Sequence, residues 1–242
     1  MMNIYDDAKF FEAYARMGRS QGGLAAAGEW HQLRRWFPNL DGRTMLDLGC
    51  GYGWHCAYAA QMGAKRVLGL DQSEKMLEAA RARNAHPAIS YVLGDLRHLE
   101  ASGETFDFVL SNLALHYVED LDNVFVQICR VLRPGGVFLL NMEHPVFTAG
   151  VNQDWAYDEA GKVLHWPVDD YFYPGKRMTR FLGRQVEKYH HTLTQIFMGL
   201  VGAGFQVTAM EEAMPEDALR ELPEMKNEMR RPMMLMVQAK KR

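Results

Sequence analysis

The stretch Thr44–His55, TMLDLGCGYGWH, decides the fold of this chain. It begins as an apolar run that carries one acid, Asp47, and then breaks into glycines at alternate positions, Gly49, Gly51 and Gly53. The alanine-rich segment that follows is typical of a helix. Glycine tolerates positive φ and lets another molecule approach the backbone without a Cβ in the way. A strand, a glycine-dense turn and a helix start together predict a nucleotide-sized pocket at the carboxyl end of a strand.

The spacing of the glycines argues against a dinucleotide site. Such a turn needs G-x-G-x-x-G, or alanine in the last place. Counted from Gly49 the sixth residue is Trp54, and counted from Gly51 it is Cys56, so neither register fits. An NAD-dependent dehydrogenase would share the fold, but we disfavour it because this third small residue is missing.

Further motifs follow in order along the chain. The run KRVLGL at 65–70 predicts a second strand that ends on Asp71. An acid at this place can accept hydrogen bonds from a ribose diol. Ser73 is suited to cap the next helix. Three more apolar runs, at 89–93, 106–110 and 137–140, predict strands, and the phrase LRPGG supplies the turn before the last of them.

From Asp47 to Leu140 these motifs resemble class I S-adenosylmethionine (SAM) dependent methyltransferases of the small-molecule type, the group called methyltransferase domain 11. The resemblance implies an α/β fold with a Rossmann-like, mostly parallel seven-stranded sheet of order 3-2-1-4-5-7-6 and helices on both faces. It also implies SAM as cofactor and S-adenosylhomocysteine as product.

The resemblance further implies which residues hold the cofactor. The glycine turn and Asp47 would take the amino acid end, Asp71 the ribose, and Asp95 with an apolar neighbour the adenine. Arg19 is a candidate partner for the SAM carboxylate or for an acidic acceptor. The expected cofactor-binding residues are Arg19, Asp47, Gly49, Cys50, Gly51, Gly53, Trp54, Asp71, Gln72, Met76, Gly94, Asp95, Leu96, Asn112 and Leu113.

Length and composition predict one domain of 242 residues, with an N-terminal helical cap (1–40), a SAM-binding core (41–143), an insertion (144–187) and a C-terminal helix with two strands (188–242). Net charge −3 and a pI near 6.3 argue against a nucleic-acid partner. We expect a cytoplasmic protein, because neither a signal-peptide pattern nor a membrane-length apolar run is present. It would be a monomer or a homodimer. Three cysteines are too few for a disulfide framework, and we expect no metal.

Two segments outside the core are candidates for closing the site. The N-terminal residues predict two helices separated near 18–23. The insertion is rich in Gly, Pro and aromatic residues, and we interpret it as a substrate cover, with a dimer contact as the alternative. Helical periodicity returns over 189–201, and the last strand, over 233–239, is expected to be antiparallel.

Methyl transfer needs a general base only where the acceptor must lose a proton. His116 and His144 follow the fourth and fifth strands, so each is a candidate base, although both could merely shape the pocket. The expected substrate-contacting residues are Tyr14, His116, His144, Tyr171, Tyr189 and His190.

The sequence therefore favours an enzyme that methylates a small molecule at O, N or C. The alternative is a non-catalytic SAM-binding sensor or partner subunit, because the motifs specify cofactor binding rather than chemistry. Free space beside the methyl group would separate the two.

Overall fold

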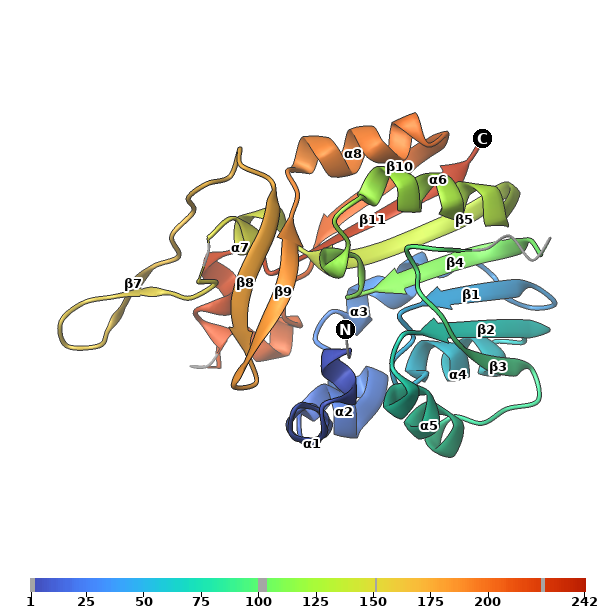
Figure 1. Ribbon diagram of the computed structural model, residues 1–242, viewed down its shortest axis with the longest axis horizontal. Coiled ribbons are helices and arrows are strands. Elements are labelled where there is room, and N and C mark those ends of the chain that lie inside the picture. Colours follow the sequence, from blue (N-terminus) through green and yellow to red (C-terminus); the bar gives the residue numbers. More distant parts are fainter. Residues whose placement is uncertain (1–2, 100–103, 151, 223–224) are drawn as a thin grey trace.

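The computed structural model describes residues 3–99, 104–150, 152–222 and 225–242 (Figure 1). Its centre is a seven-stranded sheet in the order β10-β11-β5-β4-β1-β2-β3, which confirms the predicted order. The strands are parallel except β11, which runs antiparallel to both of its neighbours, as expected. Their bounds are β1 (Thr44–Leu48), β2 (Arg66–Asp71), β3 (Ile89–Leu93), β4 (Phe106–Asn112), β5 (Leu132–Glu143), β10 (Phe205–Glu212) and β11 (Met234–Lys241).

Helices cover both faces of this sheet. Helices α6 (Leu121–Val131) and α8 (Leu193–Gly202) pack on one face through buried apolar side chains such as Phe125 and Leu200. Helices α4 (Trp54–Gln61) and α5 (Glu74–Arg83) cover the other, where Leu77 is buried (Figure 1). Ser73 caps α5 as predicted, because its side chain accepts a hydrogen bond from the Met76 amide.

The N-terminal region is more helical than its glycines indicate. It comprises η1 (Ile4–Asp6), α1 (Ala8–Ala15), α2 (Gly18–Gly22), η2 (Gly23–Ala26), α3 (Trp30–Leu33) and η3 (Arg34–Trp36). The prediction of a break near 18–23 was wrong, because tertiary contacts outweigh glycine's low helix propensity. Ser20 in α2 is buried, and its carbonyl accepts a hydrogen bond from Arg83. The helix ends at Gly23, whose φ is +61°.

Two hairpins follow β5. They lie after α7 (Pro145–Ala149) and consist of β6 (Ala156–Tyr157) with β7 (Val163–His165), and β8 (Gly175–Phe181) with β9 (Arg184–His190). The expectation of helix from residue 189 was wrong at its start. RQVEKYH alternates exposed and buried residues as a strand does, and Thr192 then opens α8 with a capping box. In Figure 1 the β8–β9 hairpin stands at the edge of the sheet where the parallel strands end.

Short 3-10 turns complete the described elements: η4 (Leu115–Tyr117), η5 (Asp217–Leu219) and η7 (Glu228–Arg230). A search of the described residues finds no helix that is both long and apolar enough to span a membrane.

Candidate functional site

A cavity of about 500 Å³ opens at the carboxyl ends of β1, β2 and β4. Its floor comes from the sheet core, and its other walls come from the N-terminal segment and the β8–β9 hairpin. The volume is within the range of small-molecule sites, roughly 300–1,000 Å³. The residues that line it include Tyr5, Tyr14, Arg19, Ser20, Gly49, Cys50, Gly51, Tyr52, Trp54, His55, Asp71, Gln72, Met76, Gly94, Leu96, Arg97, Asn112, Leu113, Tyr117, Met178, Gln185, Val186, Glu187 and Tyr189.

The glycine turn and Asp71 form one unit of the floor. Gly51 has a φ of +52°, and its amide donates to the Asp71 carboxylate at 2.8 Å. The Ser73 amide donates to the other carboxylate oxygen at 2.9 Å. A Cβ at Gly51 would meet no protein atom within 4 Å, so the backbone here faces open space. Burial raises the pKa of Asp71, although these amide hydrogen bonds act in the opposite direction.

A strained backbone position lies beside the glycine turn. Leu113 has a φ of +57°, which is rare for a residue with a Cβ, and its amide donates to the Asn141 carbonyl at 2.7 Å. A strained backbone conformation persists only where the surrounding contacts fix it, and such conformations are common at ligand-binding sites. The Asn141 side chain in turn donates to the Asn112 side chain at 2.8 Å.

Several polar atoms of the cavity wall have no partner within the described part of the chain. The hydroxyls of Ser20 and Tyr52 and the indole nitrogen of Trp54 are buried and without a hydrogen bond. Buried polar groups are normally paired, so these three point to a polar ligand. Nearby, Arg19 forms an ion pair with the buried carboxylate of Glu29.

Tyrosine rings form the wall opposite the floor. The Tyr5 and Tyr117 hydroxyls are hydrogen-bonded to each other at 3.0 Å, although they lie 112 residues apart. The ring of Tyr14 meets that of Tyr5 edge to face, with 5.2 Å between the centroids. Burial raises the pKa of all three phenols, so they are neutral hydrogen-bonding groups at neutral pH.

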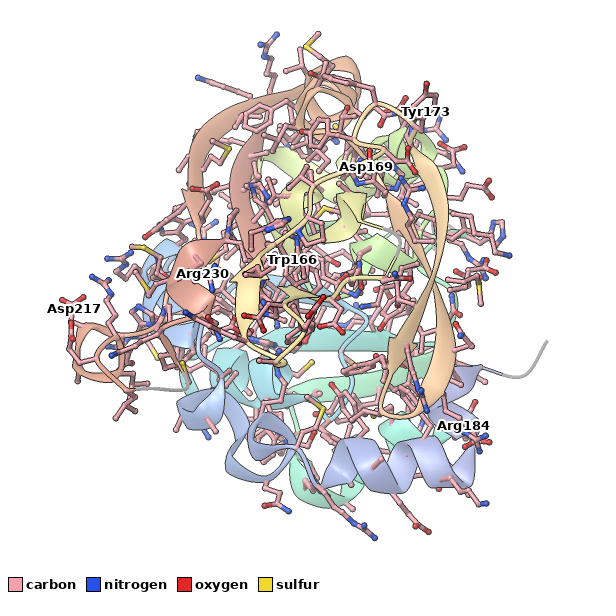
Figure 2. The ribbon with its side chains drawn as sticks, turned by 90° about the vertical axis from the view of Figure 1, so that its left-hand side faces the viewer. Trp166, Asp169, Tyr173, Arg184, Asp217 and Arg230 are labelled. Atoms are coloured by element: carbon pink, nitrogen blue, oxygen red, sulfur yellow. The ribbon has the colours of Figure 1, made fainter. Side chains whose placement is uncertain are left out.

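The tip of the β8–β9 hairpin contacts helix α1, and both elements also contribute residues to the cavity lining. Arg184 forms an ion pair with Asp7 at 3.2 Å, and the Phe181 ring meets the Phe10 ring with 5.9 Å between centroids. Figure 2 shows Arg184 at the hairpin tip beside α1. Segments from distant parts of the chain thus close the site together.

Most of the residues that the sequence singled out lie on this cavity. The following line it: Tyr14, Arg19, Gly49, Cys50, Gly51, Trp54, Asp71, Gln72, Met76, Gly94, Leu96, Asn112, Leu113 and Tyr189. The structure does not bring the following into the lining: Asp47, Gly53, Asp95, His116, His144, Tyr171 and His190.

Three of these residues lie close behind the wall. Asp47 belongs to β1 and is buried, with the Cys56 thiol donating to it at 3.3 Å, and burial raises its pKa to about 7. Gly53 is the N-cap of α4 and has a φ of +74°, and a Cβ there would clash with the Tyr91 hydroxyl. The Asp95 carboxylate binds Arg97 through two of its nitrogens.

The candidate histidines are held by other contacts. His144 caps α7 and lies 3.2 Å from Glu212, while His190 bonds Thr148 and the Tyr171 carbonyl. The Tyr171 hydroxyl accepts from the amide that begins α8. His116 is buried beneath Tyr117, and burial lowers its pKa to about 4.

A buried ion pair, Glu143–Lys188, joins β5 to β9 beside His116. Burial alone would raise the pKa of Glu143, but the charge of Lys188 and that of His116 when protonated hold it below its usual value. Within the described ranges no three His, Cys, Asp or Glu side chains lie together as a metal ion would require.

Comparison with known proteins agrees with this geometry. The family described as "Methyltransferase domain" matches residues 46–140. A putative SAM-dependent methyltransferase from Listeria monocytogenes, known from its crystal structure, is 46% identical, with a TM-score of 0.87 over 91% of this chain and 99% of that one. This chain belongs to the SAM-dependent methyltransferases.

Two further relatives extend the likeness over nearly the whole chain. A SAM-dependent methyltransferase from Mesorhizobium loti is 42% identical, with a TM-score of 0.83 over 90% of this chain and all of that one. An uncharacterized protein from Haemophilus influenzae is 30% identical over 99% of this chain and 97% of its own length.

The cavity of this methyltransferase fits SAM on its own chemistry. It offers a fixed carboxylate at Asp71 for a diol, an open glycine at Gly51, and unpartnered donors in Ser20, Tyr52 and Trp54 for a charged amino acid end. Aliphatic side chains at Met76 and Leu96 suit a flat base. SAM is the cofactor of this family, and the observed groups match its parts.

Sequence reasoning missed part of the lining. Ser20, Tyr52 and Tyr117 were not among the expected site residues, although Tyr52 lies within the glycine turn and Tyr117 directly follows His116. The hairpin residues Gln185 and Glu187 fell within the insertion that was expected to cover the substrate, but they were not singled out; the period-two alternation of their strand is the signal that could have found them.

Proposed function

We propose that this methyltransferase acts on a small molecule that shares the cavity with SAM. The observation that carries the proposal is that the same cavity is lined by the glycine turn and by elements that close over it, the N-terminal segment and the β8–β9 hairpin. A cavity of about 500 Å³ that is shared with SAM has room only for a compact acceptor. The net charge of −3 also supports a small acceptor over a nucleic acid.

The residues would divide the work as follows. Asp71 accepts hydrogen bonds from the ribose, and Arg19 with the three unpartnered donors holds the carboxylate end. Leu96 packs on the adenine, with Asp95 behind it. Bound SAM supplies an activated methyl group. Tyr117 and Tyr14 then orient the acceptor atom in line with it, because methyl transfer depends mainly on positioning.

The positions of the candidate bases bear on this mechanism. His116 and His144 are outside the cavity lining and are engaged or buried elsewhere. We therefore propose that His116 supports the Tyr117 ring, against which it packs at 4.4 Å between centroids, rather than removing a proton.

A turnover assay with a space-filling variant tests the proposal. Purified protein is incubated with SAM and libraries of small acceptors, and S-adenosylhomocysteine is measured. Tyr117→Trp should reduce turnover at least tenfold while S-adenosylhomocysteine affinity changes by less than about threefold. Tyr157→Trp, on the exposed β6–β7 hairpin, is the matched control and should leave both unchanged.

The same experiment separates an enzyme from a non-catalytic SAM-binding protein. Tight binding of SAM without any acceptor-dependent product across the libraries would favour the sensor. Equal turnover in Tyr117→Trp and the parent protein would show that the acceptor does not bind in this cavity.

A further inference from the structure

The first observation concerns proton acceptors in the cavity wall. Among its described lining residues His55 is the sole imidazole, and burial lowers its pKa to about 4, which makes it a poor base. Asp71 already accepts two backbone amides. Glu187 is bound by Lys176 and by the Tyr189 hydroxyl at 2.6 Å. An acceptor that must lose a proton before attack, such as an alcohol, finds no suitable group here.

The second observation concerns cations. The two arginines of the described lining are each engaged by a carboxylate: Arg19 pairs with Glu29, and Arg97 binds Asp95 in a bidentate manner. Arg97 is held in a strong bidentate pair. Arg19 contacts Glu29 through one nitrogen and is assigned above to the SAM carboxylate, so neither guanidinium is left for an acidic acceptor. A carboxylate or phosphate acceptor would therefore enter a wall whose positive charges are already neutralised.

The third observation concerns the tyrosine wall. Tyr5, Tyr14 and Tyr117 come together by an edge-to-face contact and a hydroxyl pair, and each ring keeps part of its surface accessible to the cavity. Aromatic faces attract cations, and arrays of them recognise ammonium groups. The wall suits a positive charge better than a negative one.

We propose that the acceptor is a small aliphatic amine, methylated on nitrogen against the wall formed by Tyr5, Tyr14 and Tyr117. This inference rests on the proposed function. The free amine enters after losing its proton to water, and its nitrogen lone pair forms the bond to the methyl carbon. The carbon–sulfur bond breaks toward sulfur, so the positive charge passes from sulfur to nitrogen.

No base is required in this reaction, because the product ammonium keeps every proton that the free amine carried. The tyrosine faces would lie beside the positive charge both before transfer, when it is on sulfur, and after transfer, when it is on nitrogen. The absence of a suitable base and of an unpaired arginine in the described wall, together with the ring array, therefore favours one acceptor class.

A binding experiment tests the proposal without turnover. Protein saturated with S-adenosylhomocysteine is titrated calorimetrically with choline, a quaternary ammonium, and with 3,3-dimethylbutanol, its neutral isostere. We expect choline to bind at least fivefold more tightly. Tyr14→Leu should abolish that preference, and Tyr14→Phe, which keeps the aromatic face, should retain it. The same pair of substitutions at Tyr117 gives a second set should Tyr14→Leu fail to fold.

The outcomes separate this inference from the proposed function. Equal binding of choline and its isostere, or a charge preference that survives both leucine variants, would overturn the amine acceptor. Failure of S-adenosylhomocysteine to bind would instead overturn the cofactor assignment. A product assay completes the test, since turnover of phenols or carboxylic acids in place of amines would contradict the inference.

Discussion

Replacing Asp71 by alanine should weaken S-adenosylhomocysteine binding about 100-fold. Its carboxylate is held by the Gly51 and Ser73 amides at 2.8 and 2.9 Å, which fixes it for a ribose diol. Each hydrogen bond to a charged group contributes about 1.5–3 kcal/mol, so losing two costs roughly 3 kcal/mol or more. That energy corresponds to about two factors of ten in Kd.

The assay is calorimetric titration of purified protein, with chemical denaturation to show that the fold is intact. Asp71→Asn should weaken S-adenosylhomocysteine binding about tenfold, because one oxygen acceptor remains but the negative charge is lost. Glu74→Gln is the matched control, because Glu74 is an exposed carboxylate only three residues further on, at the start of α5, and its replacement should change Kd by less than about twofold. An affinity for Asp71→Ala within twofold of the parent protein would refute the ribose role.

Three other substitutions probe separate parts of the account. Gly51→Val should abolish detectable S-adenosylhomocysteine binding. Gly161 also has a positive φ and open space around it but lies in an exposed turn, so Gly161→Val should leave binding intact. Equal loss of binding in the two variants would point to backbone strain alone. Lys188→Met should lower the free energy of unfolding by about 3 kcal/mol at pH 7, because it leaves Glu143 buried and unpaired. The folded-state pKa of Glu143 is depressed, so the ion pair stabilises the fold above the usual carboxyl pKa of 4.5 and this stabilisation is lost below it. The free energies of unfolding of Lys188→Met and the parent protein should therefore converge as the pH falls. A difference between them that does not change with pH would contradict the pairing. Arg184→Glu should leave the free energy of unfolding nearly unchanged, since the pair with Asp7 is exposed to solvent, yet it should speed amide exchange in α1. Unchanged exchange would argue against the hairpin contact.

The sheet could be predicted from the sequence because its signals are local and mutually consistent. The apolar run at 45–48 became part of β1, whose five residues are all buried, and the Ser73 cap formed as expected. Parallel strands buried on both faces are continuous apolar runs, which single-sequence reasoning detects well. The glycine turn is equally local, because positive φ at Gly49, Gly51 and Gly53 follows from residue type.

The closing elements could not be predicted in the same way, because long-range contacts decide them. Helix α2 forms despite its glycines since Ser20 packs against the core and Arg83 binds its carbonyl. The Tyr5–Tyr117 pair joins residues that are 112 positions apart in the sequence, and no spacing rule connects them. The histidines were chosen for their chemistry, but burial decides whether such a group reaches a ligand.

A crystal structure of the protein with S-adenosylhomocysteine tests the central claim most directly. The account predicts the ribose hydroxyls within hydrogen-bond distance of the Asp71 carboxylate, the amino acid carboxylate near Ser20 and Trp54, and the thioether sulfur facing Tyr14 and Tyr117. A ligand bound outside this cavity, or bound with its sulfur turned away from the tyrosine wall, would contradict it.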